Sequence, residues 1–193
     1  MPPLIVAWQY ALPFFAVFVL VFFPEAILTM RTGKNAGKQD AGSFPIVLVA
    51  QYFAMMAAFV IAFRIRSAAL PHSRWWFWTG LGVMITGSLL RRHCIRTLGA
   101  SFSTAVIVQR NQVIVERGAY RWIRHPSYTG GILIYIGLGI ALGNWLALAE
   151  LFVLVVASYS YRVFVEERAL VETLGQPYRD YMGRTKRFIP LII

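Results

Sequence analysis

Five apolar stretches dominate this sequence and restrict the folds open to it. They are 16 to 20 residues long and lie at residues 4–23, 44–63, 75–90, 127–142 and 146–165. A helix needs roughly 20 mostly apolar residues to cross the hydrocarbon core of a bilayer. Hydrophobic residues make up 58% of the 193 residues, whereas about 45–50% is usual in soluble domains. The sequence therefore predicts a single all-α membrane domain, residues 1–193, with five transmembrane helices.

The first stretch is expected to remain in the mature protein. It lacks the basic start and the small-residue cleavage site of a secretory signal peptide. Pro13 lies within it and is predicted to kink the helix rather than end it.

Basic residues between the stretches predict the orientation. The first connector, the third connector and the segment from Arg162 onward hold sixteen Lys and Arg residues, and the second connector holds three. Connectors rich in Lys and Arg stay cytoplasmic. We therefore expect a cytoplasmic C-terminus and an external N-terminus, in a prokaryotic cell membrane or a eukaryotic endoplasmic reticulum. The net charge of +11 then reflects topology and contact with anionic lipids. Nucleic-acid binding is not expected, because no basic soluble domain is present.

Cysteine and histidine offer little chemistry of their own. Cys94 is the single cysteine, so no internal disulfide can form. His72, His93 and His125 have no Cys, Asp or Glu at metal-ligand spacing. No metal site is therefore expected.

The connector after the fourth stretch is "GNW" at residues 143–145, which predicts a tight antiparallel helix hairpin. Gly139 and Gly143 are four residues apart, a spacing that lets membrane helices approach closely. The hairpin brings "ERGAYRWIRHPSY" at residues 116–128 and "EERALVETLGQPYRDYMGRTKRFIP" at residues 166–190 to one side of the membrane. These two polar segments are expected to wall a pocket at the headgroup level.

The fourth helix is expected to begin at Pro126, because proline suits the first helical position. His125 then stands at the cap, and the backbone N–H groups of Ser127, Tyr128 and Thr129 are left without partners. A helix N-terminus of this kind can bind an anionic or polar ligand.

The second segment continues the fifth stretch as a helix. Arg162 and Glu166 are four residues apart and share a helix face. Charges at the end of a membrane helix are costly unless they face a partner or a water-filled cavity. These two residues therefore form either a structural ion pair or part of a polar site. Gly175 is predicted to end the helix.

At these residues the chain resembles a known family. "GAYRWIRHPSYTGG" at residues 118–131, followed by "EERALVETLGQPYRDYMGRTKRFIP", resembles the isoprenylcysteine carboxyl methyltransferase family of integral membrane enzymes, in its compact prokaryotic form. The resemblance implies S-adenosylmethionine as the methyl donor, S-adenosylhomocysteine as the product, and a cofactor pocket formed by residues 91–126 and 162–193. It also implies a prenylated cysteine, or a similar lipid-like molecule, as the methyl acceptor.

The resemblance further implies roles for individual residues. Arg162 matches the arginine that faces the substrate, and it is expected to bind the acceptor as the catalytic residue. Cofactor contacts are expected at Gln109, Gln112, Val113, Ile114, Val115, Tyr120, His125, Pro126, Ser127 and Tyr128, and at Glu166 or Glu167.

Methylation of a carboxylate suits these residues. A free chain carboxyl group has a pKa of about 3.5, so the acceptor is already ionised and needs no general base. The reaction instead needs alignment and the exclusion of water. The lipid part of the acceptor is expected to enter laterally from the membrane, and the cofactor from the cytoplasm. The polar segments therefore lie beside an apolar span.

Three other functions remain open on the sequence. Phospholipid N-methyltransferases share a similar C-terminal pattern, and their amine acceptor needs a base, such as His125 or Glu167. Membrane sterol reductases carry a related RHPxY segment but bind NADPH, for whose 2′-phosphate this chain reserves no clear basic contacts. A membrane scaffold without activity would leave the arrangement of Tyr120, His125 and Glu166 unexplained.

Overall fold

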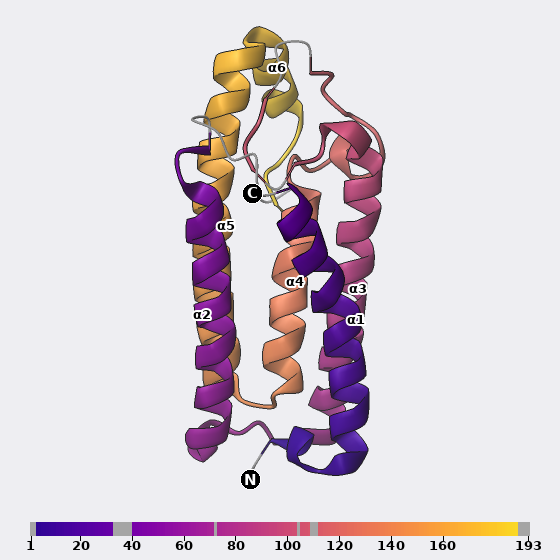
Figure 1. Ribbon diagram of the computed structural model, residues 1–193, viewed down its shortest axis with the longest axis vertical. Coiled ribbons are helices and arrows are strands. Elements are labelled where there is room, and N and C mark those ends of the chain that lie inside the picture. Colours follow the sequence, from indigo (N-terminus) through magenta and orange to yellow (C-terminus); the bar gives the residue numbers. More distant parts are fainter. Residues whose placement is uncertain (1–2, 33–39, 72, 104, 109–111, 189–193) are drawn as a thin grey trace.

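Six α-helices make up most of the structure (Figure 1). The computed structural model describes residues 3–32, 40–71, 73–103, 105–108 and 112–188. The α-helices are α1 (Trp8–Thr32), α2 (Ser43–Arg64), α3 (Ser73–Leu98), α4 (Pro126–Ala141), α5 (Trp145–Leu174) and α6 (Gln176–Arg184). Single turns of 3-10 helix lie at Leu4–Val6, Arg66–Ala68, Gly99–Ser101 and Gly118–Arg121. The described residues contain isolated bridges but no β-strand, which agrees with the predicted all-α class.

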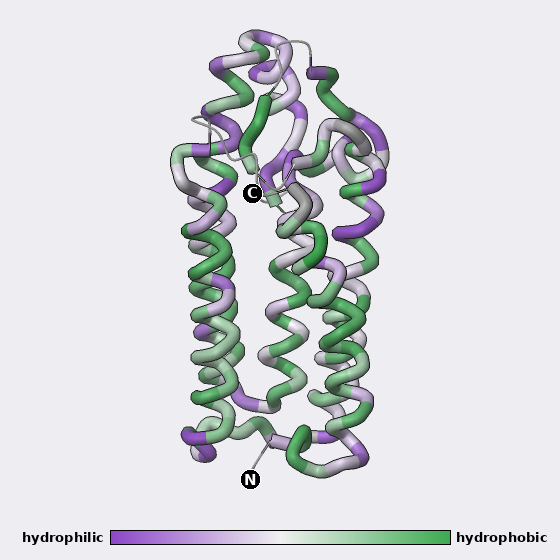
Figure 2. Tube along the Cα trace, viewed as in Figure 1, coloured by the Kyte–Doolittle hydropathy of each residue, from purple (hydrophilic) through white to green (hydrophobic). Residues whose placement is uncertain are grey.

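Helices α1 to α5 lie alongside one another, and α6 caps one end of the bundle (Figure 1). At this end α1, α3 and α5 finish, and α2 and α4 begin. Figure 2 shows hydrophobic residues along the bodies of the helices and hydrophilic residues gathered around α6. The end of α1, the start of α2, the described residues between α3 and α4, and the segment after α5 therefore meet at one polar end of the bundle.

Within the described residues, three helices are long and apolar enough to cross a membrane: α1 over Trp8–Met30, α2, and α5. Large side chains such as Phe15, Val49 and Phe53 are exposed on the outside of the bundle, as lipid contact requires. These apolar helices fit an integral membrane protein. The count of five spans stays a prediction, because α4 has 16 residues and α3 ends in a run of arginines.

Some helices extend beyond the apolar stretches from which they were predicted. Helices α2, α4 and α5 begin within a residue of the predicted starts, whereas α1 and α3 continue to Thr32 and Leu98. Hydropathy marks the part of a helix that suits lipid. Arginine and leucine are good helix formers, so α3 continues well past the point where its apolar stretch ends.

Glycines let α3 and α4 pack backbone against backbone. A Cβ atom added at Gly87 would lie 2.7 Å from the carbonyl oxygen of Gly130, and one at Gly80 would lie 2.6 Å from that of Gly137. No smaller side chain exists, so these four positions set the distance between the two helices. Small residues at helix interfaces are typical of membrane proteins.

The predicted role of two other glycines is confirmed at one and wrong at the other. A Cβ atom at Gly139 would lie 2.7 Å from the backbone of Leu148 in α5, so this glycine does allow a close approach. Gly143 has open space around it and a φ of +65°. It serves the tight turn between α4 and α5, because glycine adopts positive φ without a steric penalty.

Two arginines of α3 hold the upper part of α1. Pro24 lies inside α1 and has no N–H group, so the carbonyl of Leu20 lacks its helical partner. Arg92 donates to that carbonyl through Nη2 at 2.6 Å. Arg91 forms an ion pair with Glu25, with 2.8 Å between Nε and Oε2. The proline therefore creates an acceptor that ties α1 to α3.

Candidate active site

The segment before α4 lies against the segment after α6. The amide of Arg124 donates to the carbonyl of Lys186 at 2.7 Å, and the amide of His125 donates to that of Arg187 at 3.1 Å. Ile123 and Lys186 form an isolated parallel bridge. The prediction that the two polar segments meet is confirmed, and backbone hydrogen bonds are what join them.

Glu167 fastens these segments to α5. Its carboxylate accepts from Arg124 Nε at 2.7 Å and from Arg187 Nε at 3.1 Å. The ring of His125 lies 3.3 Å away through Nε2. The side chain of Glu167 is 5% exposed. Arg124 also donates to the carbonyl oxygens of Met182 and Thr185. The Glu167 carboxylate is therefore surrounded by three side chains of the protein, those of Arg124, Arg187 and His125.

Glu166 has a different environment from its neighbour. Its carboxylate accepts a hydrogen bond from the Tyr128 hydroxyl at 2.7 Å. The His125 Nδ1 atom lies 3.9 Å away, and the side chain of Glu166 is 29% exposed. The rings of His125 and Tyr128 are stacked, with centroids 5.6 Å apart. The Glu166 carboxylate can therefore accept further hydrogen bonds, and it faces an open space.

That space consists of two adjoining cavities with volumes of about 50 and about 80 Å³. Both are bordered by the segment after α3, by the start of α4 and by the end of α5. The predicted cofactor residues that line one or both are Gln112, Val113, Ile114, Val115, Tyr120, His125, Ser127, Tyr128 and Glu166. Pro126 and Glu167 are buried behind them, and Gln109 lies outside the described residues.

Tyr120 provides a polar atom that suits a ligand. Its hydroxyl is buried beside both cavities and has no hydrogen-bond partner among the described residues. Burial raises the pKa of this phenol well above its usual value, so the hydroxyl remains a donor at neutral pH. The Tyr181 hydroxyl donates to the Tyr120 carbonyl at 2.7 Å and fixes the backbone there. Buried hydroxyls normally find a partner, and here a bound molecule could supply it.

Arg162 is buried and is joined to a carboxylate that the sequence analysis did not consider. Its Nη1 atom donates to Asp40 and to the Ser43 hydroxyl, and its Nε atom lies 3.4 Å from the Tyr128 hydroxyl. Burial alone would raise the pKa of Asp40, but hydrogen bonds from the amides of Phe44 and Val106 and from Arg162 bring the pKa below its usual value. Asp40 is therefore an ionised partner of Arg162.

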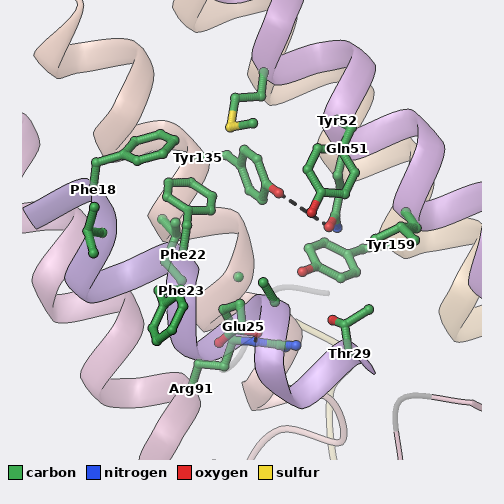
Figure 3. A pocket seen from close by; sticks show the side chains of 16 residues that line it. Phe18, Phe22, Phe23, Glu25, Thr29, Gln51, Tyr52, Arg91, Tyr135 and Tyr159 are labelled. Atoms are coloured by element: carbon green, nitrogen blue, oxygen red, sulfur yellow. Dashed lines mark hydrogen bonds and ion pairs between the residues drawn. The ribbon is translucent and has the colours of Figure 1, made fainter. Parts of the chain in front are cut away.

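A third and larger cavity lies between α1, α2, α4 and α5 (Figure 3). Its volume is about 350 Å³. Phe18, Phe22 and Phe23 line it from α1, and Gln51 and Tyr52 line it from α2. Phe23 and Tyr52 are also more than half exposed on the outside of the bundle, so the cavity reaches the surface that would face lipid.

A small cavity of about 70 Å³ lies between this apolar cavity and the smaller of the two polar ones. It shares Arg91 and Gln51 with the apolar side, and Tyr128 and Ser103 with the polar side. Arg162 also lines it. Two buried arginines therefore border the junction between an apolar chamber and a polar one.

The start of α4 differs in part from the open donor site that the sequence predicted. Pro126 does occupy the first turn, with His125 at the cap. However, the amides of Tyr128 and Thr129 both donate to the carbonyl of His125, at 3.0 and 3.2 Å. The predicted unpaired donors at these two residues are therefore wrong, and the third, at Ser127, stays a prediction.

Three residues that border the junction or pair with its arginines were not predicted from the sequence: Asp40, Glu25 and Arg91. Asp40 and Arg162 are 122 positions apart in the chain, and Glu25 and Arg91 are 66 positions apart. The signal in the sequence that could have identified the two carboxylates is the small number of acidic residues. The chain has eight acidic residues. Glu25 and Asp40 lie beside the ends of apolar stretches, where a charge needs a partner.

Comparison with known proteins gives a consistent result. The model of the isoprenylcysteine carboxyl methyltransferase family matches residues 79–172. A protein-S-isoprenylcysteine O-methyltransferase from Tribolium castaneum is 34% identical over 125 residues, which are 64% of this chain and 44% of that protein. The enzyme of that name from Schizosaccharomyces pombe is 33% identical over 59% of this chain and 49% of its own length. The matches thus span about half the length of these relatives.

Two comparisons extend over the whole chain. A probable protein-S-isoprenylcysteine O-methyltransferase from Oryza sativa subsp. indica is 24% identical over 96% of both chains. A solved structure of a eukaryotic intramembrane Ras methyltransferase of this type superimposes with a TM-score of 0.67 and 26% identity, over 99% of this chain and 68% of that chain.

Proposed function

We propose that this chain transfers a methyl group from S-adenosylmethionine to the carboxylate of a prenylated cysteine, or of a similar lipid-like acceptor, in the membrane. The match of residues 79–172 to the isoprenylcysteine carboxyl methyltransferase family and the superposition on a solved enzyme of that type support the proposal. The observation that carries the proposal is the row of cavities. An apolar chamber at the outer face of the bundle meets a polar chamber at a junction bordered by Arg91 and Arg162. Such an arrangement suits two substrates that come from different phases.

The residues of the polar chamber fit the cofactor. The carboxylate of Glu166 can accept hydrogen bonds from ribose hydroxyls or from an ammonium group, and the unpartnered Tyr120 hydroxyl can donate one. Apolar side chains at Val113, Ile114 and Leu174 can cover an adenine ring. When bound, S-adenosylmethionine would supply an electrophilic methyl group on a sulfonium.

The polar chamber must widen to accept that molecule. Its two parts measure about 50 and about 80 Å³, whereas ligand pockets usually enclose roughly 300–1,000 Å³. The floor is formed by α4 and α5, which are held by Glu167 and its partners. We therefore expect the wall formed by Ser101 and residues 112–115 to move away from Glu166 when the cofactor binds.

The junction suits a carboxylate acceptor. Arg162 and Arg91 border it, and the buried Nε2 atom of Gln51 has no hydrogen-bond partner within the described residues. Guanidinium groups bind carboxylates through paired hydrogen bonds. A guanidinium group carries only hydrogen-bond donors, so an ammonium group, which also carries only donors, cannot pair with it as a carboxylate does. These groups therefore support carboxyl methylation over the N-methylation of a phospholipid.

The chain's own residues would align the reactants rather than activate them. The acceptor carboxylate is ionised at neutral pH, so no residue has to remove a proton. Arg162 would orient it toward the polar chamber, and the apolar chamber would hold the prenyl chain and exclude water. Holding two reactants in this way removes much of the entropic barrier to their reaction.

Ligand binding and turnover test this proposal. The protein purified in detergent should be stabilised by S-adenosylhomocysteine, by about 2.7 kcal/mol at one hundred times the dissociation constant, and should not be stabilised by NADPH. It should methylate a small prenylcysteine and leave phosphatidylethanolamine unchanged. Stabilisation by NADPH alone would instead support a reductase, and methylation of the phospholipid alone would support an N-methyltransferase.

A further inference from the structure

We propose that Asp40 is a positioning residue for the transfer: it limits the hold of Arg162 on the acceptor carboxylate and fixes Arg162 relative to the polar chamber. This inference rests on the proposed function. Asp40 lies just before α2, outside residues 79–172 that match the family model. Its role therefore follows from its contacts in this structure.

Asp40 joins three separate parts of the chain. Its side chain is buried, and its Oδ2 atom accepts from the amide of Phe44 at 2.8 Å, at the start of α2. Its Oδ1 atom accepts from the Ser43 hydroxyl at 3.2 Å, from the amide of Val106 at 2.9 Å, and from Arg162 in α5. One oxygen atom thus links the substrate-side arginine to the wall of the polar chamber, which Val106 lines.

The charge of Asp40 affects how strongly Arg162 binds the acceptor carboxylate. A buried guanidinium without a counter-charge would bind an entering carboxylate tightly. The carboxylate loses its negative charge as the methyl group arrives, so this attraction is stronger in the ground state than in the transition state. Binding that favours the ground state lowers turnover. Because Asp40 already occupies Arg162, the acceptor is oriented without being held too strongly.

The second arginine of the junction is arranged in the same way. Arg91 is paired with Glu25 at 2.8 Å, just as Arg162 is paired with Asp40. Two arginines that face one small cavity each carry a carboxylate of their own. That both arginines are paired in this way suggests that the junction requires the geometry of a guanidinium group without its excess positive charge.

The substitution Asp40→Asn tests the proposal, because asparagine has nearly the same size and lacks the charge. For methylation of a small prenylcysteine, we expect KM for the acceptor to fall about threefold and kcat to fall about tenfold. The dissociation constant for S-adenosylhomocysteine should stay within about twofold. Asp180→Asn, at a distant exposed carboxylate of α6, is the matched control and should leave all three quantities unchanged.

A purely structural role for Asp40 gives a different pattern. In that case Asp40→Asn would raise KM for the acceptor and weaken cofactor binding together, beyond the loss of stability that either role predicts. That result would overturn the proposal, as would unchanged KM and kcat. If Asp40→Asn does not fold, Asp40→Glu keeps the charge and moves it: an unchanged KM with a reduced kcat supports the proposal, and unaltered turnover overturns it. A wild-type protein without methyl transfer would overturn the proposed function itself, and this inference with it.

Discussion

Glu166 and Glu167 are adjacent in the chain but have different surroundings. The Glu166 carboxylate borders the polar chamber and accepts one hydrogen bond from Tyr128. The Glu167 carboxylate is surrounded by Arg124, Arg187 and His125. Successive residues on a helix point about 100° apart, so one carboxylate can serve a ligand while the other fastens the fold.

Substituting the two glutamates should separate these roles. Glu166→Gln should weaken S-adenosylhomocysteine binding by about 1–3 kcal/mol and leave the unfolding temperature nearly unchanged. Glu167→Gln should destabilise the protein by about 3–5 kcal/mol, because it leaves the buried Arg124 without its carboxylate. Calorimetric titration and thermal unfolding in detergent measure the two effects. Glu172→Gln, at an exposed ion pair with Arg168, is the control and should change neither. The reverse pattern would assign cofactor binding to Glu167.

Asp40 should make the stability of the protein depend on acid pH. Its pKa is lowered on folding from an ordinary value of 3.8, so its contribution to stability is complete above that value and is lost as the pH falls through the lower folded value. The difference in unfolding temperature between wild type and Asp40→Asn should be constant from roughly pH 5 to pH 7 and should shrink below about pH 4. A difference that grows on acidification would contradict this assignment.

Individual site residues were predictable from the sequence to different degrees. His125, Tyr128 and Glu166 lie in segments whose spacing and resemblance identified them, and the structure brings them together. Asp40 and Arg162 are far apart in the chain, and they meet because α2 and α5 are neighbours. A single sequence gives the periodicity within a helix but not which helices are neighbours, so this pairing could not be derived.

At the scale of elements, the contact between α3 and α4 depends on the absence of side chains. Hydropathy predicted both helices but not this contact, since an apolar stretch looks the same whether it faces lipid or another helix. The signal was the repeated glycine in each stretch, at Gly80 and Gly87 and at Gly130 and Gly137. These pairs are seven residues apart, which places each pair on one face of its helix.

Alanine at two glycines of α3 should have opposite effects. Gly87→Ala should destabilise the protein by about 1–3 kcal/mol or more, because its Cβ atom would overlap the Gly130 carbonyl and force the helices apart. Gly82→Ala, at an exposed position with nothing within 4 Å, should be neutral or stabilise by up to about 1 kcal/mol. Thermal unfolding of both variants in one detergent provides the comparison. Equal effects at the two positions would show that the close packing does not matter.

At the scale of the whole molecule, both polar segments and α6 lie at one end of the bundle (Figure 1). This end gathers sixteen of the nineteen basic residues if the chain crosses the membrane as predicted. The same end holds the polar chamber, so a cofactor from the cytoplasm would reach it directly.

Accessibility of introduced cysteines should reveal the orientation. Trp145→Cys, at the exposed first residue of α5, should react with an impermeant thiol reagent on intact cells. Glu172→Cys, near the end of α5, should react only after the cells are opened. The wild type is the control, because its single cysteine, Cys94, is fully buried and should remain unlabelled. Labelling in the opposite order would reverse the topology.

The contact between α3 and α4 also limits how this protein can diverge during evolution. Most packed positions tolerate change because a larger residue on one helix can be matched by a smaller one on its partner. At Gly80 and Gly87 the nearest obstructing atoms belong to the backbone of α4, and at Gly130 and Gly137 the nearest belong to the backbone of α3. No second substitution can shrink a peptide group. We expect these glycines to persist in descendants of this chain while the lipid-facing residues around them drift freely.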